Sequence, residues 1–139
     1  MSYRAILVAL IAWNVTHQPP AVAPDGGWPA AADAAARILR SAPTGPTEIV
    51  SLPAVKGPDA VRFPLVRAGA PLPALVAPTS EPAPGTQARI VLCDDLFRDA
   101  IGAACGGPAE GAVPASTKLK LADQFEAAPG RWISVYLPD

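Results

Sequence analysis

The stretch Arg89-Ile-Val-Leu-Cys-Asp-Asp-Leu-Phe-Arg-Asp-Ala-Ile-Gly-Ala-Ala-Cys-Gly-Gly-Pro108 decides the fold class of this chain. Its residues 90–92 are a continuous apolar run of β-favouring side chains, which is typical of a strand buried on both faces. Apolar residues then recur at helical spacing, at Phe97, Ala100, Ile101 and Ala104. Asp94 or Asp95 can cap this helix, and Gly106-Gly-Pro108 predicts its end. The stretch therefore predicts a strand followed by a helix of about three turns.

The residues before this unit predict two more helices and two strands. A helix starting at Pro29 has the apolar stripe Ala32, Ala35, Ala36 and Leu39 and an i, i+4 pair, Asp33 with Arg37. Thr47–Leu52 reads as a core strand, and residues 59–67 as a helix that Asp59 can cap. Residues 72–76 predict a short strand, which Pro71 and Pro73 restrict to a sheet edge.

The C-terminal residues predict an antiparallel hairpin. Residues 118–121 alternate as a strand with one wet face does, and Ala128-Pro-Gly130 supplies a turn. Residues 132–137 then place Ile133, Val135 and Leu137 on one face. We therefore expect an α/β fold, a small three-layer sandwich with roughly three or four mostly parallel central strands and a C-terminal antiparallel hairpin.

The beginning of the chain is apolar. Ala5–Trp13 is an uninterrupted apolar run preceded by Arg4, shorter than the ~20 residues that a spanning helix needs. It fits the last turns of a transmembrane helix, or a signal peptide with Ala21-Val-Ala23 as cleavage site, or a buried first element of the fold. We expect residues 1–15 to be such a membrane or signal-like segment, 16–28 a connector, and 29–139 a soluble α/β domain.

Charge and proline content limit the function classes. Eleven basic and twelve acidic residues give a net charge of −1, so no basic field is present to hold nucleic acid. The eighteen prolines require long irregular segments, and residues 77–87 are expected to be an exposed, extended loop.

Catalytic motifs are absent from the sequence. No phosphate-binding glycine motif and no G-x-S-x-G occur, and the single histidine, His17, has no metal-ligand partners at suitable spacing. Asp94, Asp95 and Asp99 are the only acidic cluster. They fit a ligand or metal site at the end of a strand, or, as the structural alternative, a helix cap and favourable helix-dipole charges. We expect no catalytic residue, no metal site and no cofactor, with Asp94 and Asp95 as the ligand-site candidates.

Cys93 and Cys105 form the only possible disulfide. A continuous helix of about ten residues between them would rise ~15 Å, whereas bridged Cα atoms lie within ~7 Å. Bonding therefore requires the helix to start late or to fold back at Gly102. Two buried free thiols are the alternative.

Five stretches carry a family resemblance. They are Trp13-Asn-Val-Thr-His-Gln-Pro-Pro20, Pro24-Asp-Gly-Gly-Trp-Pro29, Phe63-Pro-Leu-Val-Arg-Ala-Gly69, Leu92-Cys-Asp-Asp-Leu-Phe97 and Ala104-Cys-Gly-Gly-Pro-Ala-Glu110. Together they resemble the C-terminal extracytoplasmic tail of actinobacterial membrane glycosyltransferases of family 39, the protein-mannosyltransferase-like or aminoarabinose-transferase-like enzymes of the GT-C class. That family uses a polyprenyl-phosphate sugar donor, and its catalytic carboxylate lies in an early loop that has no counterpart in this sequence.

Three function hypotheses follow. The resemblance implies a non-catalytic accessory domain of a polytopic membrane glycosyltransferase, on the extracytoplasmic side of the cell membrane. Its partners would be the membrane, through the N-terminal segment, and the rest of the glycosyltransferase, with no nucleic acid. The second hypothesis is a stand-alone secreted or membrane-anchored α/β ligand-binding module with a site near Asp94 and Asp95. The third, a compact hydrolase or nucleotide-binding enzyme, has no motif in its favour.

Overall fold

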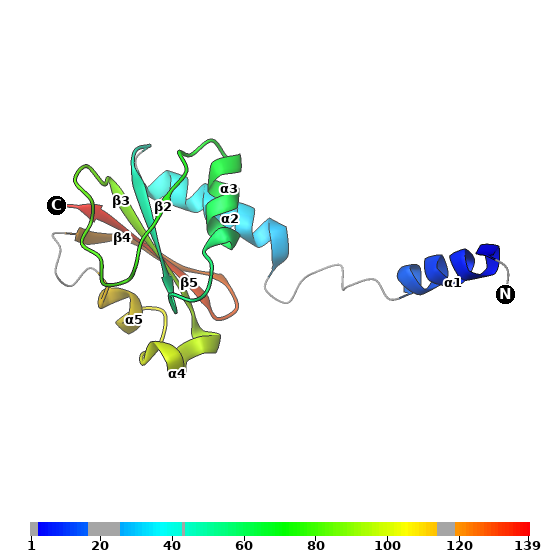
Figure 1. The fold of residues 1–139 in the computed structure, drawn as a ribbon. Helices are drawn as coiled ribbons and strands as arrows, with labels where there is room; N and C mark the ends of the chain where they lie inside the picture. Colours follow the sequence, from blue (N-terminus) through cyan, green and yellow to red (C-terminus); the bar gives the residue numbers. More distant parts are fainter. Residues whose placement is uncertain (1–2, 17–25, 43, 114–118) are drawn as a thin grey trace.

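A five-stranded mixed sheet organises the chain, with strand order β2-β1-β3-β5-β4. The computed structural model describes residues 3–16, 26–42, 44–113 and 119–139. Helices cover both faces of the sheet, so the α/β class and the layered sandwich are confirmed (Figure 1). His17, the predicted cleavage site Ala21-Val-Ala23 and Lys118 lie outside the described residues.

The parallel half of the sheet contains β1 (Thr47–Leu52), β2 (Ala74–Leu75) and β3 (Ala88–Asp94). Every residue of β3 is buried, as the apolar run predicts for a strand covered on both faces. β2 is an exposed edge strand of two residues, shorter than the predicted 72–76, because Pro73 lies directly before it and has no N–H to donate.

The antiparallel half is the hairpin β4 (Leu119–Ala128) and β5 (Arg131–Pro138), with β5 paired to β3. The predicted turn and the inward face of Ile133, Val135 and Leu137 are confirmed. The predicted alternation of 118–121 is wrong at Leu121, which is 51% exposed. Leu121 is in regular register opposite Tyr136, but it lies on β4, which is the edge strand of the sheet.

One face of the sheet, called the helix face below, is covered by α2 (Gly27–Ser41) and α3 (Asp59–Arg67). α2 starts two residues before the predicted Pro29, and its buried residues are Ala34, Ala35 and Ile38. The predicted stripe is therefore wrong at Ala36, which is exposed. α2 packs against both α3 and β4. The side of the helix that faces them includes Ile38, which is larger than Ala36 and lies in the core.

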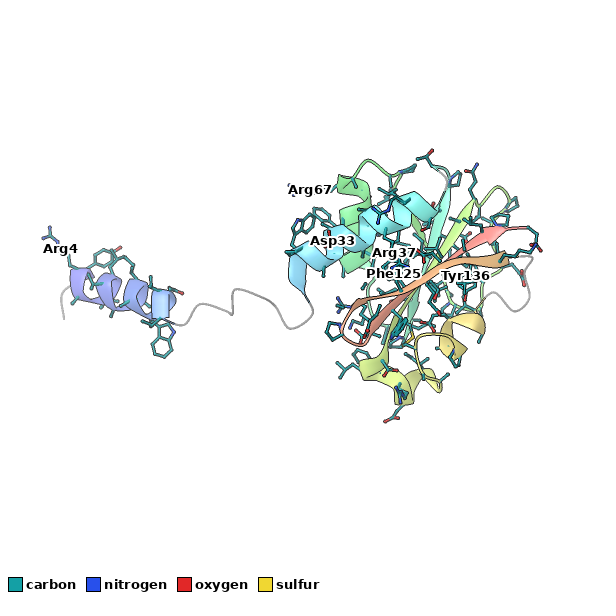
Figure 2. The ribbon with its side chains drawn as sticks, turned by 180° about the vertical axis from the view of Figure 1, so that it is seen from behind. Arg4, Asp33, Arg37, Arg67, Phe125 and Tyr136 are labelled. Carbon is teal, nitrogen blue, oxygen red and sulfur yellow. A yellow bond between two sulfur atoms is a disulfide. The ribbon has the colours of Figure 1, made fainter. Side chains whose placement is uncertain are left out.

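Arg37 is paired with the hairpin rather than with Asp33. Its Nε and a terminal nitrogen donate to the Asp123 carboxylate at 2.8 and 2.6 Å, and the guanidinium lies 4.1 Å from the centre of the Phe125 ring. Figure 2 shows Arg37 directed toward Phe125. The predicted Asp33–Arg37 pair is thus wrong, because the hairpin offers Arg37 both a carboxylate and an aromatic surface.

The opposite face, called the disulfide face below, is covered by short elements. These are η1 (Asp95–Phe97), α4 (Arg98–Ile101) and α5 (Pro108–Gly111), which pack with the connecting residues on Val50, Val91 and Cys93. α5 is a single turn that begins at Pro108. The predicted helix of about three turns is wrong, because Gly102 adopts a left-handed conformation (φ 81°) and ends α4 after one turn.

A buried ion pair on the disulfide face was not predicted. Glu48 accepts two hydrogen bonds from Arg89, at 2.7 and 3.0 Å, and the Arg89 side chain is fully buried. Glu48 also accepts from the Ala83 N–H and the Thr86 hydroxyl, while Arg89 donates to the Ser80 carbonyl. The pair therefore fixes the loop 77–87 to the sheet, although most residues of the loop are exposed, as predicted.

The N-terminal segment forms α1 (Tyr3–Thr16), which buries none of its residues. It does not form a buried first element of the α/β domain, so that interpretation is wrong. Among the helices that the structure describes, none is long and apolar enough to span a membrane.

Candidate functional site

Asp94, at the carboxyl end of β3, is almost completely buried and is held by three partners. Its Oδ1 accepts the Leu96 N–H at 3.2 Å, which is the predicted cap of the following turn. Its Oδ2 forms an ion pair with the Lys56 ammonium and lies 3.7 Å from the Arg131 guanidinium. The negative charge of the Asp94 carboxylate is therefore balanced by two cationic side chains of the same domain.

Asp95 is also bound by groups of its own segment. Its two oxygens accept from Arg98 Nε and Nη2, at 3.1 and 2.5 Å, and Oδ1 also accepts the Cys105 N–H at 3.2 Å. The hydrogen bonds from Arg98, and next that from Cys105, hold the pKa of Asp95 below its ordinary value. Asp95 thus fastens the returning chain at Cys105 to the start of the turn.

The three acids do not converge on a common point in the way that a metal or a general acid–base pair requires. Asp94 and Asp95 point to different partners, and Asp99 is an exposed residue in the first turn of α4. The contacts agree with the structural alternative, a cap and local charge pairs. We therefore find no arrangement at this corner that would activate a water or a nucleophile.

Cys93 and Cys105 are joined by a disulfide, so the structure has the bridge and not the two free thiols. Their Cα atoms lie 5.7 Å apart. The condition stated from the sequence is met, because α4 ends at Gly102 and the chain turns back. The bridge connects the carboxyl end of β3 to the segment that leads into α5.

Glu110 lies beside this bridge and is fully buried. Its carboxylate accepts hydrogen bonds from the N–H groups of Gly106 and Gly107 at 2.9 and 3.0 Å. These bonds provide partners for backbone N–H groups just before the first turn of α5. Within the described residues, Cys93, Cys105 and Glu110 are a group whose ligand atoms lie within 4.8 Å of one another. Bonded sulfurs are not thiolate ligands, so the oxidised chain does not offer this group to a metal ion.

A cavity of about 280 Å³ opens on the helix face. It is lined mainly by the first turns of α2 and α3 and by the hairpin turn, including Trp28, Phe63, Ala127 and Arg131. The Trp28 and Phe63 rings meet edge to face with centroids 6.1 Å apart. Asp94 and Asp95 are not part of its lining, but Arg131 lines it and lies 3.7 Å from the Asp94 carboxylate.

Sequence reasoning missed this cavity because its walls come from three separate segments. The one local signal was the two aromatic residues on the helices, Trp28 and Phe63, which remain 46% and 62% exposed. Large exposed aromatic side chains are unusual outside binding surfaces when they lie together. The buried Glu48–Arg89 pair was missed for a related reason, since its two residues lie on separate strands, 41 residues apart in the chain.

Comparisons with protein-family models, with curated proteins and with solved structures find no match to this chain.

Proposed function

We propose that this chain is a non-catalytic extracytoplasmic accessory domain of a polytopic membrane glycosyltransferase that uses a polyprenyl-phosphate sugar donor. In this proposal α1 belongs to the membrane-embedded part, and residues 27–139 form the domain outside it. The observation that carries the membrane attachment is that α1 is apolar over Ala5–Trp13, yet buries nothing against the domain.

The polar residues of α1 support an apolar environment for this helix. The Asn14 amide donates to the Leu10 carbonyl at 3.0 Å, and the Thr16 hydroxyl donates to the Ala12 carbonyl at 2.8 Å. Such bonds satisfy polar side chains within the helix itself, which is required where water is scarce. Trp13, one turn before the end of α1, has the residue type that is enriched at the membrane–water interface.

The disulfide supports a location outside the cytoplasm. Structural disulfides persist in oxidising compartments and are rare in the reducing cytosol. Cys93 and Cys105 are held in bonding distance by the left-handed Gly102 and by the hydrogen bond from Cys105 to Asp95. The backbone is therefore shaped for the bridge by contacts other than the bridge itself.

The non-catalytic role is supported by the state of the candidate acids. Asp94 and Asp95 are both committed to internal partners, Lys56 and Arg98 among them. The buried Glu48 and Glu110 are likewise occupied by internal hydrogen bonds. In the described residues, the acids of the domain core thus serve the fold.

Two measurements test this proposal. Expressed in a bacterial host, the chain joined to its native upstream reading frame should fractionate with membranes, and an impermeant reagent should reach the domain in intact spheroplasts. Purified residues 26–139 should fold and transfer no sugar from a polyprenyl-phosphate donor. Sugar transfer by the purified domain, or an upstream frame without hydrophobic spans, would contradict the proposal.

A stand-alone ligand-binding module is the alternative, and the cavity on the helix face is the observation that favours it. Its volume of about 280 Å³ lies near the lower end of the range for small-molecule sites. In this case Ala21-Val-Ala23 would be cleaved on export. Intact mass of the secreted protein decides: a chain beginning at Pro24 supports the alternative, and retention of α1 supports membrane attachment.

A further inference from the structure

Four exposed apolar side chains form a continuous surface on the helix face, called the aromatic patch below. They are Trp28, Phe63, Val66 and Leu72, exposed by 46%, 62%, 39% and 66%. Trp28 and Phe63 border the larger cavity, and Phe63, Val66 and Leu72 line a second hollow of about 220 Å³. Exposed apolar side chains gathered in this way indicate a surface that meets another apolar phase.

Two arginines accompany the aromatic patch. The Arg67 guanidinium lies 5.1 Å from the centre of the Trp28 ring, and Arg62 lines the second hollow. Arg62 Nε is buried and has no hydrogen-bond partner. Asp59 is the acid at this surface, so the two arginines leave it with an excess of positive charge. Long cationic side chains beside aromatic rings suit a layer that is apolar below and anionic above.

The position of the aromatic patch relative to α1 selects its partner. Gly27 and Trp28 are the first two residues of α2, and they line the cavity. Ten residues, 17–26, separate them from Thr16 at the end of α1. A chain of that length reaches at most about 35 Å. If α1 lies in the bilayer, the tether joins the domain directly at the aromatic patch.

We propose that the aromatic patch rests on the bilayer surface, with Trp28, Phe63 and Leu72 at the boundary between headgroups and acyl chains. Arg62 and Arg67 then donate hydrogen bonds to lipid phosphates. The inference depends on the proposed membrane attachment and adds a second contact to it. Two attachments, α1 and the aromatic patch, then orient the domain. The open end of the hairpin, at Leu119 and Pro138, points away from the membrane.

The test uses the full chain in phosphatidylcholine–phosphatidylglycerol vesicles whose acyl chains carry bromine, a short-range quencher of tryptophan fluorescence. Trp13→Phe with Trp132→Phe leaves Trp28 as the single reporter. Its emission should fall strongly, and more in vesicles with more phosphatidylglycerol. The matched control adds Trp28→Phe and Leu121→Trp, which places the reporter at an exposed site on β4, about 20 Å along the strand from the hairpin turn. Its emission should not change.

The outcomes separate this inference from the proposed function. A third chain, Trp28→Phe with Trp132→Phe, reports on Trp13. Quenching at Trp13 without quenching at Trp28 overturns the surface contact and leaves the membrane attachment intact; quenching at neither overturns both. Equal quenching at Trp28 and at residue 121 also overturns the proposal, because contact would then be unspecific.

Two further measurements address the case in which a variant fails to fold and the case in which a protein, and not lipid, covers the aromatic patch. If Trp132→Phe unfolds the domain, the original chain is compared with Trp28→Phe alone, and Trp28 should account for the added quenching. Shielding of Trp28 from aqueous iodide in the absence of vesicles would instead show that a second copy covers the aromatic patch, and would contradict the proposal.

Discussion

The two faces of the sheet are closed in different ways. The helix face is covered by α2 and α3, with 15 and 9 residues, whereas α4 and α5 on the disulfide face have four residues each. Helices of one turn offer little apolar surface and are not stable alone. The disulfide face is instead held by the Glu48–Arg89 pair and the Cys93–Cys105 bridge. The comparison shows that ionic and covalent links replace regular packing where the covering elements are short.

The helix face shows the opposite arrangement. Its core is apolar, and its ion pair, Arg37 with Asp123, lies at the rim and is partly exposed. This face also has the open cavity and the exposed side chains of the aromatic patch. The predictions below test whether stability is concentrated on one face and surface contact on the other.

The largest expected effect comes from breaking the buried ion pair. Glu48→Gln leaves the fully buried Arg89 guanidinium without its counter-charge. We expect a loss of about 3–5 kcal/mol in the free energy of unfolding, measured in urea. Glu81→Gln, an exposed change in the loop 77–87 that the pair holds, should alter stability by less than about 0.5 kcal/mol. If Glu48→Gln lowered the free energy of unfolding by less than about 1 kcal/mol, the charge of the Glu48–Arg89 pair would not be what stabilises this face. The packing of the loop 77–87 would then be the stabilising contribution.

The next effect concerns the covalent link. Replacing Cys93 and Cys105 together by Ala opens a loop with a sequence separation of 12. The chain-entropy model gives a loss of about 3 kcal/mol, to be measured by chemical unfolding. Before reduction, alkylation followed by intact mass should label neither cysteine of the original chain. Labelling of both would show that the thiols are free and would remove the covalent half of the comparison.

Acid should affect both faces through their carboxylates. Burial raises the pKa of Glu48, but hydrogen bonds from Ala83, Arg89 and Thr86 together outweigh it, and its pKa lies below the ordinary value. The Arg37 hydrogen bonds lower the pKa of Asp123 from 3.8 to about 2. Depressed carboxylate pKa values give stability that is complete above the unfolded-state pKa and is lost as the pH falls through the folded-state pKa.

For Asp123 the loss should therefore develop between about pH 4 and pH 2. Thermal unfolding midpoints across this range are the measurement. Asp123→Asn should be less stable than the original chain at neutral pH and should show a smaller decline in acid. If its decline matched that of the original chain, the Arg37–Asp123 pair would contribute nothing to stability at the helix face.

The smallest effect on stability is expected at the aromatic patch. Phe63 is 62% exposed, so Phe63→Ala should change the free energy of unfolding by about 0.5 kcal/mol or less. Leu65→Ala, two residues along the same helix but 2% exposed, should cost about 2–5 kcal/mol. Similar losses for the two variants would show that Phe63 belongs to the core and would weaken its assignment to a contact surface.

The segment after β3 shows where sequence reasoning reached its limit. The helical spacing of Phe97, Ala100, Ile101 and Ala104 was read as one helix, but the chain forms only η1 and α4 before it turns back. Spacing reports local preference, whereas the turn at Gly102 is fixed by contacts between residues ten or more apart, such as Asp95 with Cys105. Gly102 was the sequence signal for that turn. A fold back at Gly102 was considered only as a condition for the Cys93–Cys105 disulfide, and not as the end of the helix.

The sequence alone determined the α/β class, the buried β3, the hairpin and the position of α3, because strand burial, turn residues and helical spacing are encoded within short windows. The tertiary structure decided the cavity, the aromatic patch, the partner of Arg37 and the roles of Glu48, Asp94 and Asp95. These features join segments that are distant in the chain. Pairing between such segments depends on how the helices rotate and how the strands order, and no local pattern contains that information.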